Sequence, residues 1–111
     1  AQENLYAGTT AGADSDADTC CNIGIGYSAL HSNCAGDKNI ALGACAGTNL
    51  KAGGCNIFLG AYTGLITTDT GNVLNNIVMG TMAGQYMENS YHNRFVCWSG
   101  AEYWSYKRFD W

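Results

Sequence analysis

The chain has 111 residues, of which 47% are hydrophobic and 13% charged, and its formal net charge is −4. This composition excludes an intrinsically disordered chain, which combines low hydrophobicity with high charge. Five scattered lysine and arginine residues exclude the basic stripe of a nucleic-acid-binding protein, and Gly or Asn interrupts each apolar stretch too often for membrane insertion.

Fifteen glycines occur without a single proline. A collagen triple helix needs proline and a glycine at every third position, and the chain has neither. Abundant glycine without proline is typical of tight, repeated turns between short strands.

An internal repeat runs through most of the chain. In chain order its copies read NLYAGTTAG, NIGIGYSAL, NIALGACAG, NIFLGAYTG, NIVMGTMAG and NRFVCWSGA, beginning at residues 4, 22, 39, 56, 76 and 93. The starts are 18, 17, 17, 20 and 17 residues apart. Asp110 lies 17 residues after Asn93, as though a seventh copy began there, so we expect the sequence to belong to a longer chain.

Two columns of the repeat predict structural roles. The first column is asparagine in all six copies, and stacked asparagine side chains can hydrogen-bond along a ladder of identical positions. The predicted ladder consists of Asn4, Asn22, Asn39, Asn56, Asn76 and Asn93. The fifth column is glycine in five copies, which permits a sharp corner or a positive φ. The predicted corner glycines are Gly8, Gly26, Gly43, Gly60 and Gly80, and the last copy has Cys97 at this position.

The three columns in between are mostly apolar. Strand geometry places the second and fourth columns on one face, which we expect to form the core of each rung. They contain Leu5, Ile23, Ile40, Ile57 and Ile77, with Arg94 as the exception, and then Ala7, Ile25, Leu42, Leu59, Met79 and Val96. The third column, on the opposite face, contains Tyr6, Gly24, Ala41, Phe58, Val78 and Phe95.

A strand that is apolar on both faces is usually buried on both. We therefore expect other copies of the chain to cover the third column, with three chains around an axis. The alternative is a lone solenoid with a mildly apolar exterior.

These features predict an all-β fold, a β-solenoid or β-roll with rungs of about 17 residues, assembled as a parallel homotrimeric fibre. A helical repeat is excluded, because apolar residues alternate with period two and helical repeats need about 33 residues or more. We expect residues 1–101 to form a six-rung repeat region and residues 102–111 an aromatic-rich cap or a junction to a following segment.

Tandem NxAhGxxAh units, where h is apolar, with loops rich in Asn, Thr, Ser and Gly, resemble the repeats of phage tail fibres, notably those of marine and cyanobacterial phages. They are also similar to the head repeats of trimeric autotransporter adhesins, which fold as left-handed parallel β-rolls in a trimer. The resemblance covers Asn4 to about Ala101. The longer repeat and the six cysteines of this chain depart from the adhesin pattern and favour the fibre.

The resemblance implies a trimeric appendage on a virion or an extracellular surface. We expect a structural segment of a tail fibre that supplies rigidity, joins other virion or filament proteins and contacts a glycan or protein on the host cell surface. One alternative is a bacterial extracellular adhesin or filament subunit of the same architecture, and a second is a carbohydrate-binding module.

An enzyme is not expected, and no cofactor is implied. A glycosidase on a β-helix needs paired carboxylates facing one groove, whereas the clustered acids of this chain lie in one short loop. His31 and His92 fall in unrelated columns of the repeat, so neither completes a recognisable nucleophilic arrangement.

The acidic loop contains Asp14, Asp16 and Asp18 at alternate positions. Three such carboxylates can converge on calcium when a turn brings them together, so they form a candidate calcium site. An EF-hand is excluded, because Thr19 stands where its glycine belongs. The alternative is a solvated acidic loop.

The candidates for disulfide bonds are Cys20, Cys21, Cys34 and Cys55. Bonds between chains would suit an extracellular fibre, and the absence of a CxxC motif gives no support to a zinc ribbon. Cys21 and Cys55 both precede the asparagine column but lie two rungs apart, about 10 Å, which is too far for a bond. The alternative is small buried side chains at corners, first of all Cys45 and Cys97.

Aromatic residues crowd the C-terminal segment. Trp98, Trp104 and Trp111 could stack on sugar rings, as in a glycan-binding surface. The alternative is that they cap the solenoid or begin a junction, since terminal repeats are usually atypical.

Overall fold

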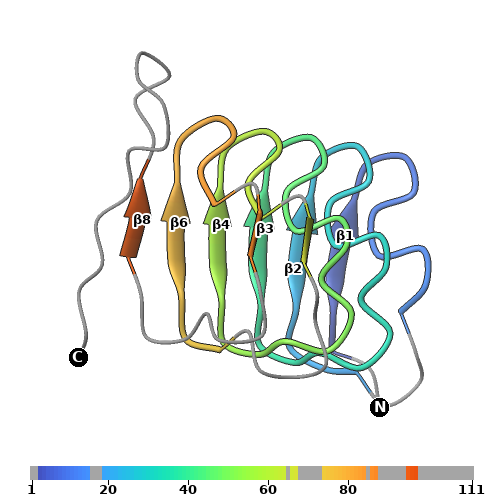
Figure 1. Ribbon diagram of the computed structural model, residues 1–111. Coiled ribbons are helices and arrows are strands. Elements are labelled where there is room, and N and C mark those ends of the chain that lie inside the picture. Colours follow the sequence, from blue (N-terminus) through green and yellow to red (C-terminus); the bar gives the residue numbers. More distant parts are fainter. Residues whose placement is uncertain are drawn as a thin grey trace.

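A computed structural model describes residues 3–15, 19–64, 66–67, 74–84, 86–87 and 95–97 of the chain. Every regular element in this part is a β-strand, and six strands form one parallel sheet (Figure 1). In sheet order these are β1 (Leu5–Ala7), β2 (Ile23–Ile25), β3 (Ile40–Leu42), β4 (Ile57–Leu59), β6 (Ile77–Met79) and β8 (Phe95–Cys97). Two shorter strands, β5 (Ile66–Thr67) and β7 (Tyr86–Met87), pair in parallel as a second sheet.

The strands β1, β2, β3, β4 and β6 occupy the same place in successive copies of the repeat. Leu5 pairs with Ile23, Ile23 with Ile40, Ile40 with Ile57 and Ile57 with Ile77, so the second column is in register across five strands. Parallel neighbours need a crossover connection, and here each crossover is one coil of the chain whose loops stack beside the sheet (Figure 1). The predicted all-β solenoid is therefore confirmed.

The strand β8 is displaced by one residue from the alignment that the sequence predicts. That alignment set Phe95 in the third column, but the structure pairs Phe95 with Ile77 in the second column. The charged Arg94 therefore leaves the second column, and Val96 enters the third. Asn93 lies outside the described residues, so its place in the asparagine ladder stays a prediction.

The core of the solenoid lies behind the third column of the repeat. The buried hydrophobic side chains of the described residues are Ala29, Leu30, Ala41, Ala46, Leu50, Phe58, Val78 and Ala83. The second column is half-buried in β2, β3, β4 and β6, and the fourth column is mostly exposed. The prediction that the second and fourth columns form the core is therefore wrong, and so is the prediction that the third column faces another chain.

The inversion follows from the asparagine column. Side chains alternate along a strand, so Asn22 and Gly24 point to one face and Ile23 and Ile25 to the other. Asn22 is fully buried and bonded to asparagines of neighbouring rungs, so the third column must point inward with it.

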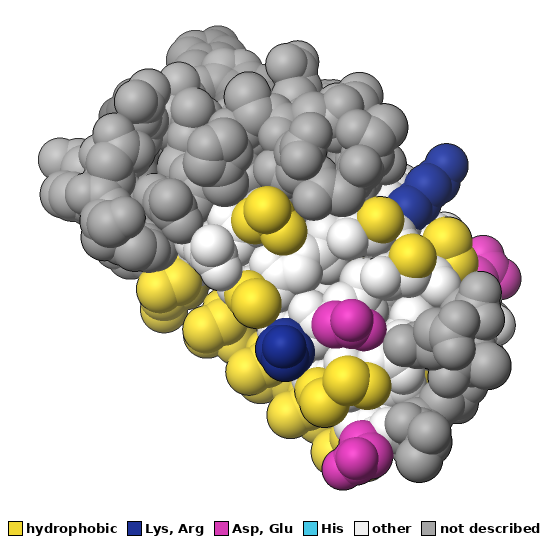
Figure 2. Space-filling model, turned by 90° about the horizontal axis from the view of Figure 1, so that it is seen from below, with side chains coloured by type: hydrophobic (Ala, Val, Ile, Leu, Met, Phe, Trp, Pro, Cys, Tyr) yellow, Lys and Arg dark blue, Asp and Glu magenta, His cyan; other side chains and the backbone are white. Residues whose placement is uncertain are grey.

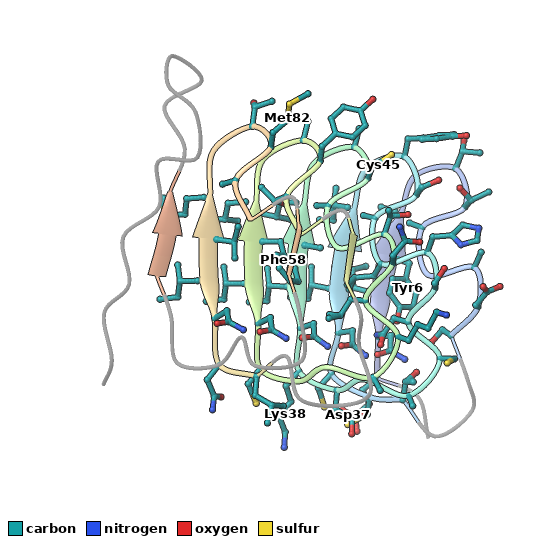
Figure 3. All side chains as sticks on the ribbon, in the orientation of Figure 1. Tyr6, Asp37, Lys38, Cys45, Phe58 and Met82 are labelled. Carbon is teal, nitrogen blue, oxygen red and sulfur yellow. The ribbon has the colours of Figure 1, made fainter. Side chains whose placement is uncertain are left out.

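Large and small side chains alternate in the interior. The rings of Tyr6 and Phe58 lie inside the coil (Figure 3), and a Cβ on Gly24 would lie only 3.1 Å from the Tyr6 ring. The rungs with a small residue in the third column are filled from the loops, by Leu30 and Leu50, which have no exposed surface. The narrow interior is thus closed by side chains of different size that complement one another.

The corner after each of the first five strands of the large sheet has a positive φ. It lies between 102° and 131° at Gly8, Gly26, Gly43, Gly60 and Gly80. A Cβ on Gly43 would lie 2.7 Å from the carbonyl carbon of Gly60 in the next rung, so stacking requires glycine as much as the backbone does. Two residues later φ is again positive, at Thr10, Ser28, Cys45, Tyr62 and Met82.

Candidate interaction surface

The outward side of the large sheet is lined by aliphatic side chains. We call it the outer sheet face, and its described side chains are Leu5, Ala7, Ile23, Ile25, Ile40, Leu42, Ile57, Leu59, Ile77 and Met79. The exposed fractions are 55% for Leu5, 41% for Ile25, 38% for Leu42 and 41% for Met79. Hydrophobic side chains follow one another along the lower left edge of the molecule (Figure 2). Single exposed apolar residues are common on protein surfaces, but a large contiguous apolar patch is typical of an interaction site for a protein, a ligand or a membrane.

The outer sheet face is regular because the strands are in register. Each rung adds the same pair of positions, and neighbouring rungs lie about 4.8 Å apart. None of these side chains carries a charge. Asp37 and Lys38, two charged residues shortly before β3, lie at the lower corner of the coil (Figure 3). The outer sheet face is therefore an uncharged apolar surface along the five strands.

Five asparagines of the first column stack inside the solenoid. The side-chain oxygens of the first four, Asn4, Asn22, Asn39 and Asn56, each accept two hydrogen bonds from the next asparagine, one from its backbone N–H and one from its side-chain amide. The backbone distances are 3.0 Å from Asn22 to Asn4, 2.9 Å from Asn39 to Asn22, 3.1 Å from Asn56 to Asn39 and 3.1 Å from Asn76 to Asn56. The side-chain distances for the same four pairs are 3.0, 3.2, 3.1 and 2.9 Å.

The side-chain amides of the stack also bond across the coil. Asn22 donates to the carbonyl oxygen of Gly36 at 2.9 Å and Asn39 to that of Gly53 at 2.7 Å. At the first rung, Asn4 donates to the carbonyl oxygen of Thr19 at 3.1 Å. The stack therefore ties β1, β2 and β3 both to the next rung and to the loop that closes their own rung.

A buried asparagine outside the repeat columns, Asn33, supports this closure. Its side-chain oxygen accepts the backbone N–H of Gly36 at 2.8 Å, and its amide donates to the Gly36 carbonyl oxygen at 3.2 Å. That carbonyl oxygen is also the partner of Asn22. Asn33 was not predicted to have a structural role, although an asparagine three residues before a glycine is a turn signal.

The predicted calcium site is only partly within the described residues. Asp14 is exposed, and its carboxylate lies 3.8 Å from Nδ1 of His31 on the next rung. Asp16 and Asp18 lie outside the described residues, so the calcium site stays a prediction. In the described segments no three His, Cys, Asp or Glu side chains come together as metal ligands.

The cysteines whose side chains the structure describes are all free thiols: Cys20, Cys21, Cys34, Cys45 and Cys55. The side chain of Cys97 in β8 lies outside the description, so its burial at a corner stays a prediction. Sγ of Cys20 and Sγ of Cys21 lie 2.9 Å apart. Cys34 is exposed, with its sulfur 3.7 Å from the carbonyl oxygen of Lys51. Cys45, predicted as a buried corner residue, is half-exposed. Among the cysteines whose side chains are described, the sulfurs that meet are those of Cys20 and Cys21, which are adjacent in the sequence.

The aromatic residues of the candidate glycan surface, Trp98, Trp104 and Trp111, lie outside the described residues. Their role stays a prediction. In the part of the chain that the structure describes, no helix has the length and apolar character to cross a membrane.

Comparisons of the chain with family models, curated proteins and solved structures gave no match. The features that bear on function are therefore those of the chain itself: an apolar outer sheet face, an internal asparagine ladder and rungs that can be repeated.

Proposed function

We propose that this chain is a structural segment of a trimeric fibre, in which three copies pack around a common axis through their outer sheet faces. The observation that carries the proposal is the outer sheet face itself, a contiguous aliphatic surface along one side of the solenoid. The resemblance of the repeat to phage tail fibres favours a virion appendage, whose task is reach, rigidity and contact with a host surface. A bacterial adhesin or filament subunit would use the same trimer.

Burial of the outer sheet face supplies the favourable energy for association. Complete burial of a leucine or isoleucine side chain stabilises by about 1.5–3 kcal/mol, so a side chain that is about 40% exposed gains about 1 kcal/mol when a partner covers it. The four most exposed side chains of the face, Leu5, Ile25, Leu42 and Met79, would therefore contribute about 12 kcal/mol in a trimer, and the half-buried isoleucines add to this. The total is of the same order as the translational and rotational cost of association, which is about 4–15 kcal/mol for each partner added.

Rigidity has a separate source inside each chain. The asparagine ladder fixes every rung to the next, and a slip of one residue would turn the buried asparagines outward and the outer aliphatic side chains inward. Parallel pairing in register and the ladder therefore oppose both bending and slipping of the coil.

The first test is the mass of the native protein by light scattering. A trimer of about 35 kDa, three times the chain mass of 11.8 kDa, is expected. Leu42→Glu, which places a charge at the centre of the outer sheet face, is expected to give monomers with unchanged far-UV circular dichroism. Lys51→Glu, an exposed loop position away from that face, is the matched control and is expected to remain trimeric.

A wild-type protein that stays monomeric at every concentration would refute the trimeric fibre. It would leave a lone solenoid, for which a carbohydrate-binding module is the remaining candidate. A trimer that survives Leu42→Glu would instead show that the chains associate through another surface.

A further inference from the structure

Cys20 and Cys21 are adjacent in the chain, yet their sulfur atoms lie 2.9 Å apart. Successive side chains of an extended segment point to opposite sides, so neighbouring cysteines do not ordinarily meet. Here Cys21 has a φ of 66°, which turns the chain at the corner before Asn22 and brings both sulfurs to one side. This conformation is uncommon for a residue other than glycine, asparagine or aspartate.

The surrounding rungs hold the corner in place. The backbone N–H of Cys20 donates to the Asp37 carboxylate at 2.8 Å, and the carbonyl oxygen of Cys20 accepts the backbone N–H of Lys38 at 3.1 Å. On the other side, Asn22 is buried in the ladder. Hydrogen bonds therefore hold the backbone on both sides of the pair in the conformation in which the two sulfurs meet.

The corner column continues in the same left-handed conformation at Lys38 and Cys55, with φ values of 60° and 59°. Cys55 is two rungs from Cys21, about 10 Å, and Lys38 lies between them. A disulfide between those rungs is therefore excluded, whereas Cys20 and Cys21 need no movement of the backbone to meet.

We propose that Cys20 and Cys21 form a reversible vicinal disulfide, a redox site that reacts by exchange with small-molecule disulfides. Cys21 is exposed and Cys20 partly exposed, so both are accessible to such a reagent. The site is independent of the proposed trimer, because both sulfurs belong to one corner of one chain.

The exchange proceeds in two balanced steps. The thiolate of Cys21 attacks one sulfur of the external disulfide and releases one thiolate, leaving a mixed disulfide on Cys21. Cys20 then gives its proton to solvent, and its thiolate attacks Sγ of Cys21 and expels the second external thiolate. Two protein thiols are oxidised, and one external disulfide is reduced to two thiols.

The electrostatics of the corner set the order of these steps. The hydrogen bond with the Cys21 side chain, partial burial, and the negative charges of Cys21 and Asp37 raise the pKa of Cys20, against a smaller opposing effect of Lys38. Cys20 therefore holds its proton more strongly than an ordinary thiol, and the exposed Cys21 makes the first attack.

The ring that results is more easily opened than an ordinary disulfide. Adjacent Cα atoms across a trans peptide are about 3.8 Å apart, whereas disulfides usually join Cα atoms about 4.4–6.8 Å apart. No peptide bond in the described segments is cis. The shorter separation favours reduction, so the site is expected to be a reversible one and not a permanent crosslink.

The test uses the whole chain, oxidised glutathione and mass spectrometry. After treatment and alkylation of free thiols with iodoacetamide, chymotrypsin cleavage after Tyr6 and Tyr27 releases a peptide that contains Cys20 and Cys21 and no other cysteine. The expected peptide carries no alkyl group and is lighter than the dithiol by two hydrogen atoms. Dithiothreitol is expected to restore two alkylation sites.

Two variants distinguish the proposal from random oxidation. Cys21→Ser is expected to leave the remaining thiol of the peptide alkylated or joined to glutathione, while Cys34→Ser, another exposed cysteine, is expected to behave as the wild type. A peptide that stays doubly alkylated under oxidation would overturn the proposal. So would a peptide joined through a disulfide to a second cysteine peptide, because it would show that the pair reacts between distant sites.

Discussion

The asparagine ladder makes a prediction that can be worked out bond by bond. Asn39 lies in the middle of the stack and has no exposed surface. Its amide donates to Asn22 at 3.2 Å and to Gly53 at 2.7 Å, and its oxygen accepts both the backbone and the side-chain N–H of Asn56 at 3.1 Å. Asn39→Ala removes all four hydrogen bonds and leaves the backbone N–H of Asn39 bonded to Asn22.

The loss of unfolding free energy in Asn39→Ala depends on which buried groups lose a hydrogen-bond partner. Two N–H groups of Asn56 lose their acceptor in a site without exposed surface, and each such loss costs about 1–3 kcal/mol. The expected decrease in the free energy of unfolding is therefore about 2–6 kcal/mol, a large part of the roughly 5–15 kcal/mol of a typical domain. Asn4→Ala is the matched control. Asn4 is half-buried at the end of the stack, where water can replace its oxygen, so about 1 kcal/mol is expected.

The assay is urea unfolding followed by far-UV circular dichroism, with all variants at one protein concentration because association also contributes to stability. A clearly lower unfolding midpoint is expected for Asn39→Ala than for Asn4→Ala. Equal midpoints for the two variants would refute it, because they would mean that depth in the stack has no influence and that water satisfies the interior asparagines as well.

Two further substitutions test the corner and the core by the same unfolding assay. Gly43→Ala is expected to destabilise by more than about 2 kcal/mol, because φ is 131° and the added Cβ would lie 2.7 Å from the Gly60 carbonyl carbon. The control is Gly54→Ala, whose Cβ would lie 3.3 Å from its nearest contact and which is expected to cost less than about 1 kcal/mol. Equal losses of stability for the two variants would contradict the stacking argument. Phe58→Ala is expected to cost about 3–5 kcal/mol, because the fully buried ring fills the interior of its rung, and a loss below about 1 kcal/mol would show that the ring is not part of the core.

The recurrence of single residues predicted much of the fold. Asparagine in every copy and glycine four residues later gave the position of each strand and the corner that follows it, because an identical residue at a fixed place in a stack is kept by its neighbours above and below. The register of β8 could not be obtained in this way. Its copy lacks the glycine, and an alignment on Asn93 was one residue off, with the charged Arg94 in an otherwise aliphatic column.

Which face points inward was predicted incorrectly, although the same rows of residues contained the answer. The second and fourth columns, which are rich in Ile and Leu, were predicted to form the core. The third column, which includes Gly24 and Ala41, was predicted to be covered by another chain. Strand alternation, however, puts the third column on the side of the asparagines, and a ladder of amides that bond to one another is most stable away from water. The interior volume is then completed by Leu30 and Leu50 from the loops, which no column of the repeat identifies.

The contact between Cys20 and Cys21 was beyond sequence reasoning for a different reason. It depends on a positive φ at Cys21, and the residues that usually signal this conformation are glycine and asparagine. At this corner the conformation is imposed by stacking on Lys38 and Cys55 in the rungs that follow. The residues next to Cys21 in the sequence therefore do not predict its positive φ.

The corrected orientation changes what a partner chain would meet. If the third column had faced outward, a partner would have met large rings such as Tyr6 and Phe58 alternating with the small Gly24 and Ala41. The outer sheet face instead presents isoleucine, leucine and methionine at positions where the rung itself leaves about 40% of the side chain exposed. Because apolar stabilisation grows with the area removed from water, the observed orientation favours the proposed association through the outer sheet face. Leu42 lies in β3, the middle of the five strands that form this face, so a single charge there is expected to have the largest effect on the proposed trimer.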